Sequence, residues 1–542
     1  MKSDDSRTRA VVVGGGLAGL AAAIELCGRG IDVSLVEVNA HLGGKMNTLE
    51  EGGFAFDMGP TLLTLPEVLC GIIRRANRRV SDLIDLVRLD PQWRCHFEDG
   101  VRLDLYENVA RMAAHLDERL PGTNAGREWA EFVSYSRRMN RLSRRVFFYR
   151  DIGGIADVLR TTPIADSQLA RDALAMRPHA TYARTVRRYL REPHVQQLAE
   201  HFLQYVGSSP FLAPSILAMI ASVQLDQGCW YAMGGTRQVA RALERLLRDA
   251  GVECLLGTRV ERILHEHGAV RGVRLSDGRE IAADVVVSNA DVRRTLRGLV
   301  GSALARAEQA RILRRWSMAC SGIVLYLGLE RRYEHLAHHN FFFSRDGQQE
   351  FEDIYRRGIP ARDPTLYVAA PSCSDATQAP PGGEALYILM HTPGVRNGTA
   401  TASREGDLAS GRAAILEKLA RFGMADLERR IVVERALTPP DIERMYGSEE
   451  GAIYGLASHG RLIGGFKPRN SSSVLRGLYF AGGSVNPGPG VPMALMSGVT
   501  AASAVARDLG LPMIDPAATA EGPRAGEYRR LDALAGAACT SV

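Results

Sequence analysis

Glycine-rich turns near the two ends of the chain are the residues best suited to chemistry. The first turn, in "VVVGGGLAGLAAA", places Gly14, Gly16 and Gly19 at the spacing G-x-G-x-x-G, and the second is "AGGSVNPGPGVPMALMSG". A turn without side chains lets the backbone approach a bound group closely, and a helix that follows offers free N–H groups to an anion. No catalytic triad, metal-ligand cluster or carboxylate pair stands out in the sequence. We therefore expect a bound cofactor to carry the chemistry.

The segments around the first turn predict a dinucleotide site. A β-branched run over residues 11–13 predicts a strand, an alanine-rich helix begins at about Leu17, and a second strand over 33–36 leads to Glu37. In such a unit the first glycine makes the tight turn, the second lets the backbone approach a pyrophosphate, and the third lets the helix pack on the sheet. An acid about 20 residues farther on binds a ribose hydroxyl, and Glu37 stands at that distance.

A second glycine pair favours FAD over NAD as the dinucleotide. Gly43 and Gly44 follow Glu37 closely and precede the cation Lys45, so they can give the pyrophosphate a second wall. The motif "FDMGPT" over 56–61 then supplies a turn rich in backbone groups that can approach a flat ring. A simple NAD domain rarely has this second wall, although the glycine pair could also form an ordinary hairpin turn.

The composition is that of an ordinary globular protein. The chain has 542 residues, of which 24% are charged and 46% hydrophobic, and its formal net charge is +6. Its eight cysteines form no C-x-x-C pair, so neither a disulfide framework nor a zinc site is expected. No signal peptide and no membrane-spanning run of roughly 20 apolar residues is found. We expect a cytoplasmic protein that touches a membrane only from the surface, and no nucleic acid as partner.

The segment between the first motifs and the middle of the chain, about residues 72–223, has mainly helical periodicity. Within it, "SRRMNRLSRRVFFYRDIGGIADVL" mixes arginines with aliphatic and aromatic residues. A basic face beside an apolar face suits a helix that lies on an anionic bilayer, but it equally suits a solvated face over a core stripe. The apolar residues concerned are Leu142, Val146, Phe147, Phe148 and Tyr149.

An alternating helix and strand pattern returns after residue 225. It contains an amphipathic helix over 239–247, strands over 253–256, 260–265 and 270–275, and a buried run over 284–288. That run is expected to rejoin the nucleotide-binding sheet at Asn289 and Ala290. Val260 is a candidate to contact adenine through its backbone N–H and C=O groups.

Taken in order, these motifs resemble a known family. The segments "VVVGGGLAGL", "GGK", "FDMGPT", "GGTRQVARAL", "VVSNAD" and "LYFAGGSVNPGPGVPMALMSG" extend from Val11 to about Ala506. They resemble the bacterial-type phytoene desaturase family of FAD-dependent carotenoid desaturases, and most of all its hydroxycarotenoid and methoxyneurosporene desaturase branch. Two positions depart from the pattern: Lys45 stands where arginine is frequent, and Asn486 stands in "NPG" where the branch usually has "HPG".

The resemblance implies the fold class and the domains. It implies an α/β protein with a Rossmann-like FAD-binding domain of the amine oxidase and GDP-dissociation inhibitor type, a helical region apposed to the membrane, and a mixed-sheet substrate domain. The segments expected are 1–75, 226–300 and 455–512 for the FAD-binding domain, 76–225 for the helical region, 301–454 for the substrate sheet and 513–542 for a flexible tail.

The resemblance also implies an activity. An enzyme of this family introduces C=C bonds into a C40 or related polyene by hydride transfer to flavin N5 and loss of a proton. We expect a quinone or oxygen as electron acceptor, because only one dinucleotide fingerprint is present. The late turn would reach the flavin, and the helix from about Val491 would point its positive N-terminus at the ring. The residues expected to bind FAD are Gly14, Gly15, Gly16, Leu17, Ala18, Gly19, Glu37, Val38, Gly43, Gly44, Lys45, Met58, Gly59, Pro60, Thr61, Val260, Asn289, Ala290, Gly482, Gly483, Val491, Pro492 and Met493.

Catalytic side chains are not evident in the sequence. His339, His459 and Asn486 are candidates, whereas Asp57 and Asp291 lie in cofactor motifs and are expected to orient backbone groups. Three alternatives remain open: another isoprenoid oxidoreductase, of the hydroxysqualene or retinol type; a flavin amine oxidase; and a prenyl-binding module without catalysis. The amine oxidase is disfavoured because Gly483 and Ser484 stand where that superfamily has an acidic residue. The intact glycines at both ends disfavour the non-catalytic module.

Overall fold

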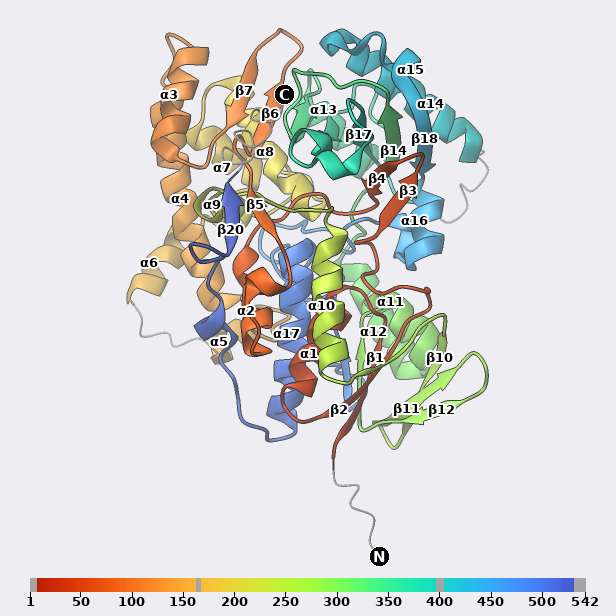
Figure 1. The fold of residues 1–542 in the computed structure, drawn as a ribbon. Helices are drawn as coiled ribbons and strands as arrows, with labels where there is room; N and C mark the ends of the chain where they lie inside the picture. The colour runs from red at the N-terminus through yellow and green to blue at the C-terminus, as the bar shows by residue number, and fades with distance from the viewer. Residues whose placement is uncertain (1–6, 162–166, 396–403, 531–542) are drawn as a thin grey trace, which may run out of the picture.

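A parallel sheet of five strands forms the lower half of the molecule in Figure 1. The computed structural model describes residues 7–161, 167–395 and 404–530. The strand order is β19-β13-β1-β2-β9, so the sheet joins segments that are far apart in the chain. All five strands come from the three segments expected to bind FAD. Their bounds are β1 Arg9–Val13, β2 Asp32–Val36, β9 Glu253–Leu255, β13 Val285–Ser288 and β19 Leu478–Phe480.

The strands of this sheet are buried on both faces, because alternate residues point to opposite sides. Val12 and Val287 enter one hydrophobic core, whereas their neighbours Val11 and Val286 enter another. The first core is closed by α1, α2, α10 and α17, of which α1, α10 and α17 stand side by side in Figure 1. These helices are α1 Leu17–Cys27, α2 Pro66–Arg75, α10 Arg237–Asp249 and α17 Val491–Asp508.

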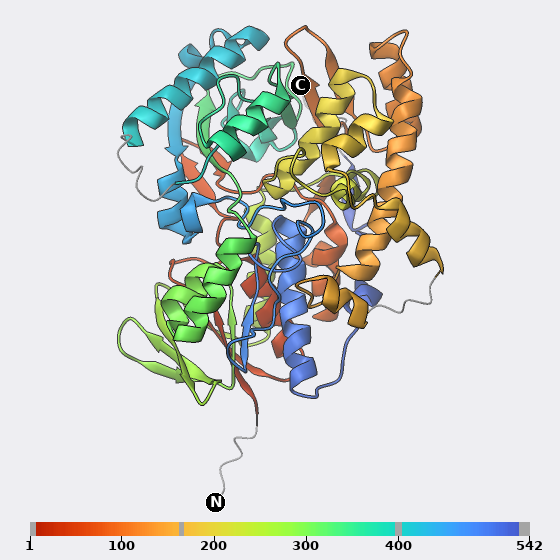
Figure 2. The same cartoon turned by 180° about the vertical axis from the view of Figure 1, so that it is seen from behind.

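The second core lies on the other face, where a small antiparallel sheet and a helix cover the strands, as Figure 2 shows from behind. Ile263 and Val273 of the small sheet and Ile312 of the helix all pack into it. The elements on this face are β10 Val260–Glu266, β11 Ala269–Leu275, β12 Glu280–Ala282, α11 Val292–Arg294 and α12 Ala303–Arg315.

A mixed sheet of seven strands forms the upper half, in the order β18-β14-β17-β16-β15-β6-β7. One face packs against α14 and α15, through Leu386 and Ile388 of β17 among others. Tyr387 and Leu389 of the same strand point to the opposite face, toward the centre of the molecule. The elements here are β6 Trp93–His96, β7 Arg102–Leu105, β14 Ser321–Leu329, β15 His339–Phe342, β16 Leu366–Ala369, β17 Glu384–Thr392, β18 Ile431–Leu437, α13 Gly347–Glu352, α14 Arg404–Leu419, α15 Leu427–Arg430 and α16 Pro439–Tyr446.

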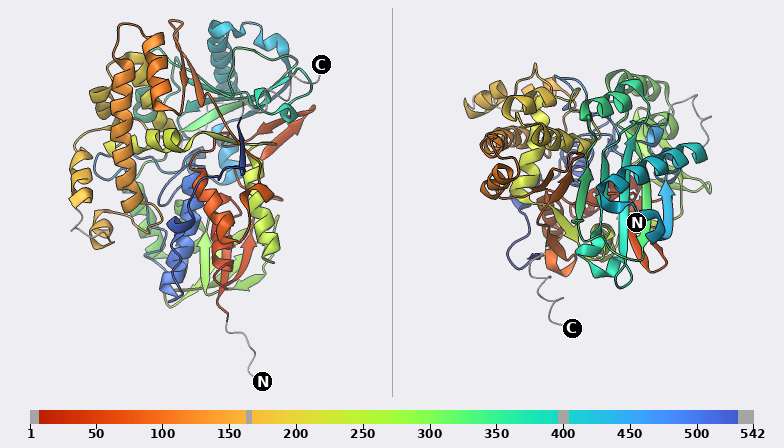
Figure 3. Two further views of the ribbon diagram at one scale, coloured as in Figure 1. Left: turned by 60° about the vertical axis from the view of Figure 1, so that its left-hand side comes forward. Right: turned by 90° about the horizontal axis from the view of Figure 1, so that it is seen from above.

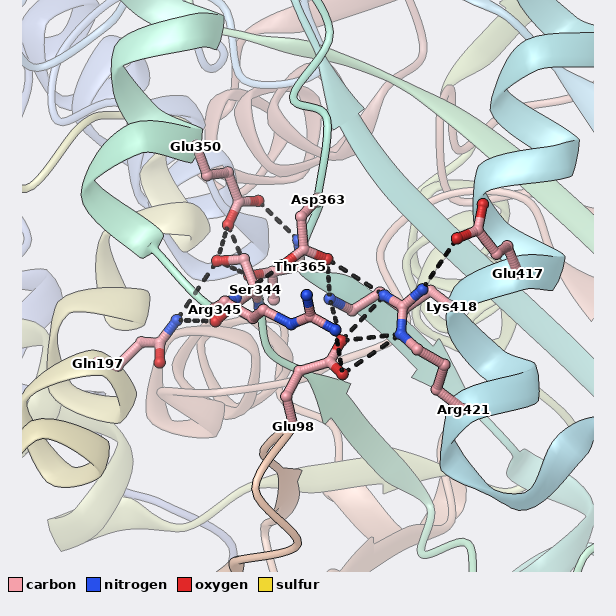
Figure 4. Close-up of polar contacts among 10 residues, drawn as sticks. All are labelled: Glu98, Gln197, Ser344, Arg345, Glu350, Asp363, Thr365, Glu417, Lys418 and Arg421. Carbon is pink, nitrogen blue, oxygen red and sulfur yellow. Dashed lines mark hydrogen bonds and ion pairs between the residues drawn. The ribbon is translucent and has the colours of Figure 1, made fainter.

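Two strands of this sheet lie in the region predicted to be helical. β6 and β7 belong to the segment 76–225, yet β6 pairs in parallel with β15. A group of charged side chains centred on the buried Lys418 holds them there (Figure 4). Lys418 of α14 lies 2.8 Å from Asp363 and 3.6 Å from Glu98, which sits in the turn between β6 and β7. The helical prediction fails here because short strands held by distant partners leave little periodic signal.

Apart from β5, which belongs to a small separate sheet, the other elements of that region are helices, and they stand as a layer beside the sheets (Figure 3). The aliphatic and aromatic residues predicted to face a membrane are packed inside instead: Leu142, Val146 and Phe148 are each less than 8% exposed. The core-stripe alternative is therefore the correct one for α4. The helices are α3 Val109–Arg119, α4 Ala125–Val146, α5 Ile155–Thr161, α6 Ser167–Ala175, α7 Tyr182–Tyr189, α8 Pro193–His201 and α9 Met219–Gln227.

The segment after Pro512 was expected to be a flexible tail, but its first part is structured. β20 pairs in parallel with β5. Arg74 of α2 forms an ion pair of 2.7 Å with Glu527. The charged residues of this segment suggested solvent exposure, but Glu527 instead helps to attach the segment to α2. Residues 531–542 lie outside the described residues. The remaining strands are β3 Thr48–Glu51, β4 Phe54–Asp57, β5 Leu86–Arg88, β8 Trp230–Ala232 and β20 Tyr528–Arg530.

Short 3-10 and π turns link these elements. Two of them matter below, because η2 and η3 contribute side chains to the central cavity. Their bounds are η1 Val80–Asp82, η2 Phe202–Val206, η3 Ser215–Ala218, η4 Thr295–Val300, η5 Asp353–Arg357, η6 Pro371–Cys373, η7 Ala376–Gln378, η8 Ala420–Met424, η9 Glu449–Gly451 and η10 Pro516–Thr519.

Candidate cofactor and substrate site

A cavity of about 600 Å³ is lined by residues of both sheets and of the helical layer. Nearly all residues predicted to bind FAD lie on its wall. Gly15 and Gly19 are the exceptions among the predicted residues. Those on the wall are Gly14, Gly16, Leu17, Ala18, Glu37, Val38, Gly43, Gly44, Lys45, Met58, Gly59, Pro60, Thr61, Val260, Asn289, Ala290, Gly482, Gly483, Val491, Pro492 and Met493.

Gly15 and Gly19 lie behind the wall and shape it. The N–H of Gly15 donates to Glu37 over 2.7 Å, and its carbonyl accepts a hydrogen bond of 2.8 Å from the N–H of Gly43. A β-carbon at Gly19 would lie 2.0 Å from the carbonyl oxygen of Gly14, so only glycine fits against the turn. These two glycines therefore position the others.

The two early glycine motifs lie side by side in the wall. Gly16 and Gly43 form an isolated parallel bridge, and a β-carbon at Gly44 would lie 3.1 Å from the Cα of Gly16. A β-carbon at Gly16 would lie 2.6 Å from the side-chain oxygen of Asn289. Side chains at these positions would fill the space beside the turn. The bare backbone cradle that remains suits a pyrophosphate.

Two helix N-termini open on this cavity. α1 begins after Gly16 and α17 after Gly490, and neither N-cap residue forms a side-chain cap hydrogen bond. Both N-cap residues lie on the cavity wall. Each N-terminus carries unpaired N–H groups and a partial positive charge, so both favour an anionic or electron-rich ligand. The site thus offers positive potential from two directions.

Glu37 is held by its own neighbours at the end of β2. Its side chain is 5% exposed, and one carboxylate oxygen accepts hydrogen bonds of 2.8 Å from the backbone and the side chain of Asn39. The other oxygen accepts the hydrogen bond from Gly15. These contacts orient the carboxylate on the wall, where it could also accept hydrogen bonds from a ribose. Asn39 is a wall residue that the sequence interpretation did not name.

Lys45 uses part of its donor capacity within the protein. Its ammonium donates to the carbonyl of Ile453 over 2.8 Å and to that of Ala452 over 3.3 Å. Burial lowers the pKa of Lys45 to about 8, although the charge of Asp291 opposes this effect. The predicted second wall of the pyrophosphate site therefore rests mainly on the backbone of Gly43 and Gly44.

The buried aspartates near the cofactor motifs orient backbone groups, as expected. Asp57 accepts a hydrogen bond of 2.8 Å from the N–H of Thr236, at the start of α10. Burial raises the pKa of Asp57 to about 7 and outweighs that hydrogen bond. Asp291 caps α11 by accepting from the N–H of Arg293. Each aspartate joins a cofactor motif to a neighbouring element.

The three candidate catalytic residues do not lie on the cavity wall. His459 accepts a hydrogen bond of 3.0 Å from the N–H of Ser209, and burial lowers its pKa to about 4, so its imidazole is neutral at pH 7. The amide of Asn486 donates to the carbonyl of Arg150 over 2.6 Å. His339 contacts the wall residue Tyr367, whose hydroxyl lies 2.8 Å from its Nδ1 atom.

An apolar chamber continues from the cofactor side of the cavity. Its floor is the inner face of the seven-stranded sheet, where Tyr387, Leu389 and His391 alternate along β17. The opposite side is formed by η2, η3 and α9 of the helical layer. The sequence interpretation named none of these residues, because a chamber between distant segments has no local signal. The main lining residues are His201, Gln204, Tyr205, Ile216, Met219, Ile220, Val223, Phe341, Tyr367, Tyr387, Leu389 and His391.

The described residues form neither a metal-ligand cluster nor a membrane-spanning helix. Within residues 7–161, 167–395 and 404–530, no group of three or more histidine, cysteine or acidic side chains could hold a metal ion. In the same ranges no helix is both long and apolar enough to cross a bilayer. The described cysteines are free thiols.

Comparison with known proteins agrees with this architecture. The family described as flavin containing amine oxidoreductase matches residues 17–506. Among solved structures, an oxidoreductase from Methanosarcina mazei superposes with a TM-score of 0.60 at 17% identity, covering 91% of this chain and 99% of that one. Cyclohexylamine oxidase from Brevibacterium oxydans gives a TM-score of 0.57 at 17% identity, covering 93% and 100%. These two likenesses concern the fold.

Two relatives with higher sequence identity match this chain over all or nearly all of their own length. The 4,4'-diaponeurosporene oxygenase of Staphylococcus haemolyticus is 35% identical, over 91% of this chain and 96% of that protein. The 4,4'-diapolycopene oxygenase of a Methylomonas species is 36% identical, over 94% of this chain and 100% of that protein. The glycine cradle, the two open helix ends and Glu37 fit the cofactor that the family uses. The chain belongs to the flavin containing amine oxidoreductase family, and FAD is its cofactor.

Proposed function

We propose that the protein is an FAD-dependent oxidoreductase that acts on an acyclic carotenoid. The observation that carries the proposal is the apolar chamber that opens directly onto the cofactor cradle. A long hydrocarbon offers almost nothing to hydrogen-bond, so its binding must come from burial of apolar surface, at roughly 25 cal/mol per Å². The names of the two relatives, which refer to acyclic polyenes, support the same substrate class.

FAD, when bound, supplies the redox chemistry, because it accepts two electrons from the substrate. The protein's own residues bind and orient both partners. The backbone at Gly14, Gly16 and Gly44 would hold the pyrophosphate, and Glu37 the ribose. The N-terminus of α17 would lie at the ring end of the cofactor, where its partial positive charge stabilises negative charge. Tyr387 and Leu389 would place the polyene against that end and exclude water.

The reaction we propose first is oxidation of a terminal carbon of the carotenoid. Both relatives named above are called oxygenases, and each matches over nearly the whole chain. Formation of C=C bonds is the second candidate, because the order of motifs from "VVVGGGLAGL" to "LYFAGGSVNPGPGVPMALMSG" resembles carotenoid desaturases. Oxygen is the preferred electron acceptor for the first reaction, and a quinone or oxygen for the second.

Pigment analysis distinguishes these reactions. The gene is expressed in hosts that accumulate diaponeurosporene, diapolycopene, neurosporene, lycopene or phytoene, and the pigments are separated by chromatography with mass detection. A gain of oxygen at one end supports the first reaction, and a loss of two hydrogens supports the second. Gly16→Val serves as a control that should not retain FAD. If no pigment changes in any host while the wild type contains FAD, the proposed function is wrong.

We also propose that the protein binds a membrane surface, at a different place from the one first expected. Apolar side chains are exposed on α5, on α6 and in the loop before Gly465, which lies on the cavity wall. A substrate confined to the bilayer would enter from such a surface. Sedimentation with vesicles containing anionic lipid tests this, and replacement of the exposed leucines by aspartate should abolish it. The leucines are Leu159, Leu174 and Leu462, which are 61%, 82% and 63% exposed.

A further inference from the structure

One polar side chain in the apolar chamber has an atom without a partner. Gln204 of η2 is 4% exposed and lies on the cavity wall. Its side-chain oxygen is buried and has no hydrogen-bond partner among the described residues. A buried amide oxygen left unpaired lowers the stability of the folded state, because it has lost the hydrogen bonds that water would provide. Such a group in a binding cavity indicates that the ligand supplies the missing partner.

Other polar groups of the chamber contact the turn that carries Gln204. The N–H of Gly207 donates to the carbonyl of Gln204 over 3.0 Å, and a β-carbon at Gly207 would lie 2.4 Å from the ring of Tyr454. The hydroxyl of Tyr454 is in turn 3.3 Å from Nε2 of His391. The turn that carries Gln204 therefore packs against the Tyr454 and His391 pair. Tyr205 is different, because its hydroxyl donates to Gln224 over 2.7 Å.

The charge of the chamber limits the ligand. The wall residues contributed by 201–223 and by β14 to β17 include no aspartate, glutamate, lysine or arginine. Burial lowers the pKa of His391 to about 4, and burial together with the nearby His391 lowers that of His201 to about 3. Both imidazoles are therefore neutral at pH 7. A carboxylate would find no counter-charge there, whereas a hydroxyl or carbonyl oxygen would need none.

We propose that Gln204, assisted by Tyr454 and His391, binds a neutral oxygen atom at one end of the polyene. The ligand class is an acyclic carotenoid that already carries a terminal hydroxyl group. The unpaired oxygen of Gln204 is an acceptor, so it needs the O–H of a hydroxyl, whereas an aldehyde has no hydrogen to donate to it. This inference rests on the proposed function, and it makes Gln204 a residue that determines specificity. The enzyme would then favour an oxygenated polyene over the parent hydrocarbon.

The test compares two ligands that differ only in this oxygen. FAD-loaded protein is titrated without oxygen with an acyclic polyene hydrocarbon and with the same polyene bearing a terminal hydroxyl, and binding is followed by the polyene absorbance. Gln204→Met keeps the length of the side chain but removes the amide, and Gln204→Leu is the second variant. Each should weaken binding of the hydroxylated polyene roughly tenfold, the equivalent of one lost hydrogen bond, and change hydrocarbon binding less than about twofold.

The control is Gln196→Leu, on α8, where the glutamine amide donates to the carbonyl of Leu190 and does not line the cavity. It should change the binding of neither ligand. The inference is overturned if the Gln204 variants weaken both ligands equally or weaken neither. The proposed function fails separately, if the wild type binds neither polyene and neither one bleaches the flavin absorbance. Thermal unfolding shows whether each variant folds. If one of the two Gln204 variants does not fold, the binding measured with the other one tests the inference.

Discussion

A β-carbon at Gly498 would lie 2.2 Å from the carbonyl oxygen of Ala18. Gly498 lies in α17, which follows the late glycine turn, and Ala18 lies in α1, which follows the first one. The two helices can therefore approach closely only because one of them has no side chain at this point. This contact sets both helix N-termini at the same cavity, so the two glycine turns serve opposite ends of one site.

Replacement of Gly498 by alanine should force α1 and α17 apart. Overpacking of this kind lowers the stability of the fold by about 1–3 kcal/mol. FAD binding should weaken as well, because both helix ends line the FAD site. We expect a lower melting temperature and a smaller ratio of flavin to protein absorbance after purification. Gly298→Ala is the matched control, because a β-carbon there meets nothing within 4 Å. Equal flavin content in the two variants would contradict this account.

The nucleotide-binding half could be predicted from the sequence because its signals are local. The turn at Gly14, the β-branched runs and the acid Glu37 follow one another at fixed spacing. The residue type needed at each of these positions depends only on neighbours that are close in the sequence. β1 near the start of the chain and β19 near its end lie in one sheet and are separated there by β13. A known order of motifs was enough to place them.

The substrate half could not be predicted in the same way, because its determinants are contacts between distant segments. β6 is four residues long, and its place is set by pairing with β15 and by the buried Lys418. Phe148 reads equally well as a membrane contact or as a core residue, and only packing decides between them. Gln204 gives no sequence signal, because its importance lies in the partner that it lacks.

Removal of the Glu37 side chain should weaken FAD binding. Glu37→Ala leaves the N–H groups of Gly15 and Asn39 without their acceptor, and each such loss costs about 1–3 kcal/mol. A flavin fluorescence titration of the apoprotein should show weaker binding by at least roughly tenfold. The FAD affinity of Glu37→Gln should lie between that of Glu37→Ala and that of the wild type, because its amide oxygen still accepts one hydrogen bond. Glu253→Ala, an exposed position on β9, is the control. Unchanged FAD affinity in Glu37→Ala would remove this residue from the site.

Asp57 should make stability depend on pH. Because burial raises the pKa of Asp57 to about 7, the folded protein keeps this proton while the unfolded chain releases it above about pH 4. The contribution of Asp57 to the free energy of unfolding is complete below about pH 4. It is lost as the pH rises to about 7, by up to about 1.4 kcal/mol for each pH unit. Asp57→Asn cannot titrate but still accepts from Thr236. Its melting temperature should therefore fall less between pH 4 and 7 than that of the wild type. The same slope in both proteins would show that Asp57 ionises normally, and Asp32→Asn, at an exposed position on β2, should retain the wild-type slope.

Lys418 should be the critical residue of the charged group that attaches β6 and β7 to α14 (Figure 4). Its side chain is 1% exposed and contacts both Asp363 and Glu98, whose side chains are 31% and 14% exposed, so Lys418→Met leaves two partly buried carboxylates with less compensation. Breaking a fully buried ion pair costs about 3–5 kcal/mol, and the cost here should be smaller because water partly solvates both carboxylates. Arg345→Met is the control, because that side chain is 68% exposed and its contact with Glu98 is 3.5 Å, a pair worth about 0–1 kcal/mol. Urea unfolding should therefore show a much lower midpoint for Lys418→Met than for Arg345→Met.

Equal midpoints would mean that Arg421, which lies 2.9 Å from Glu98, neutralises the acids alone. In that case Lys418→Met combined with Arg421→Met should unfold at a far lower urea concentration than either single variant.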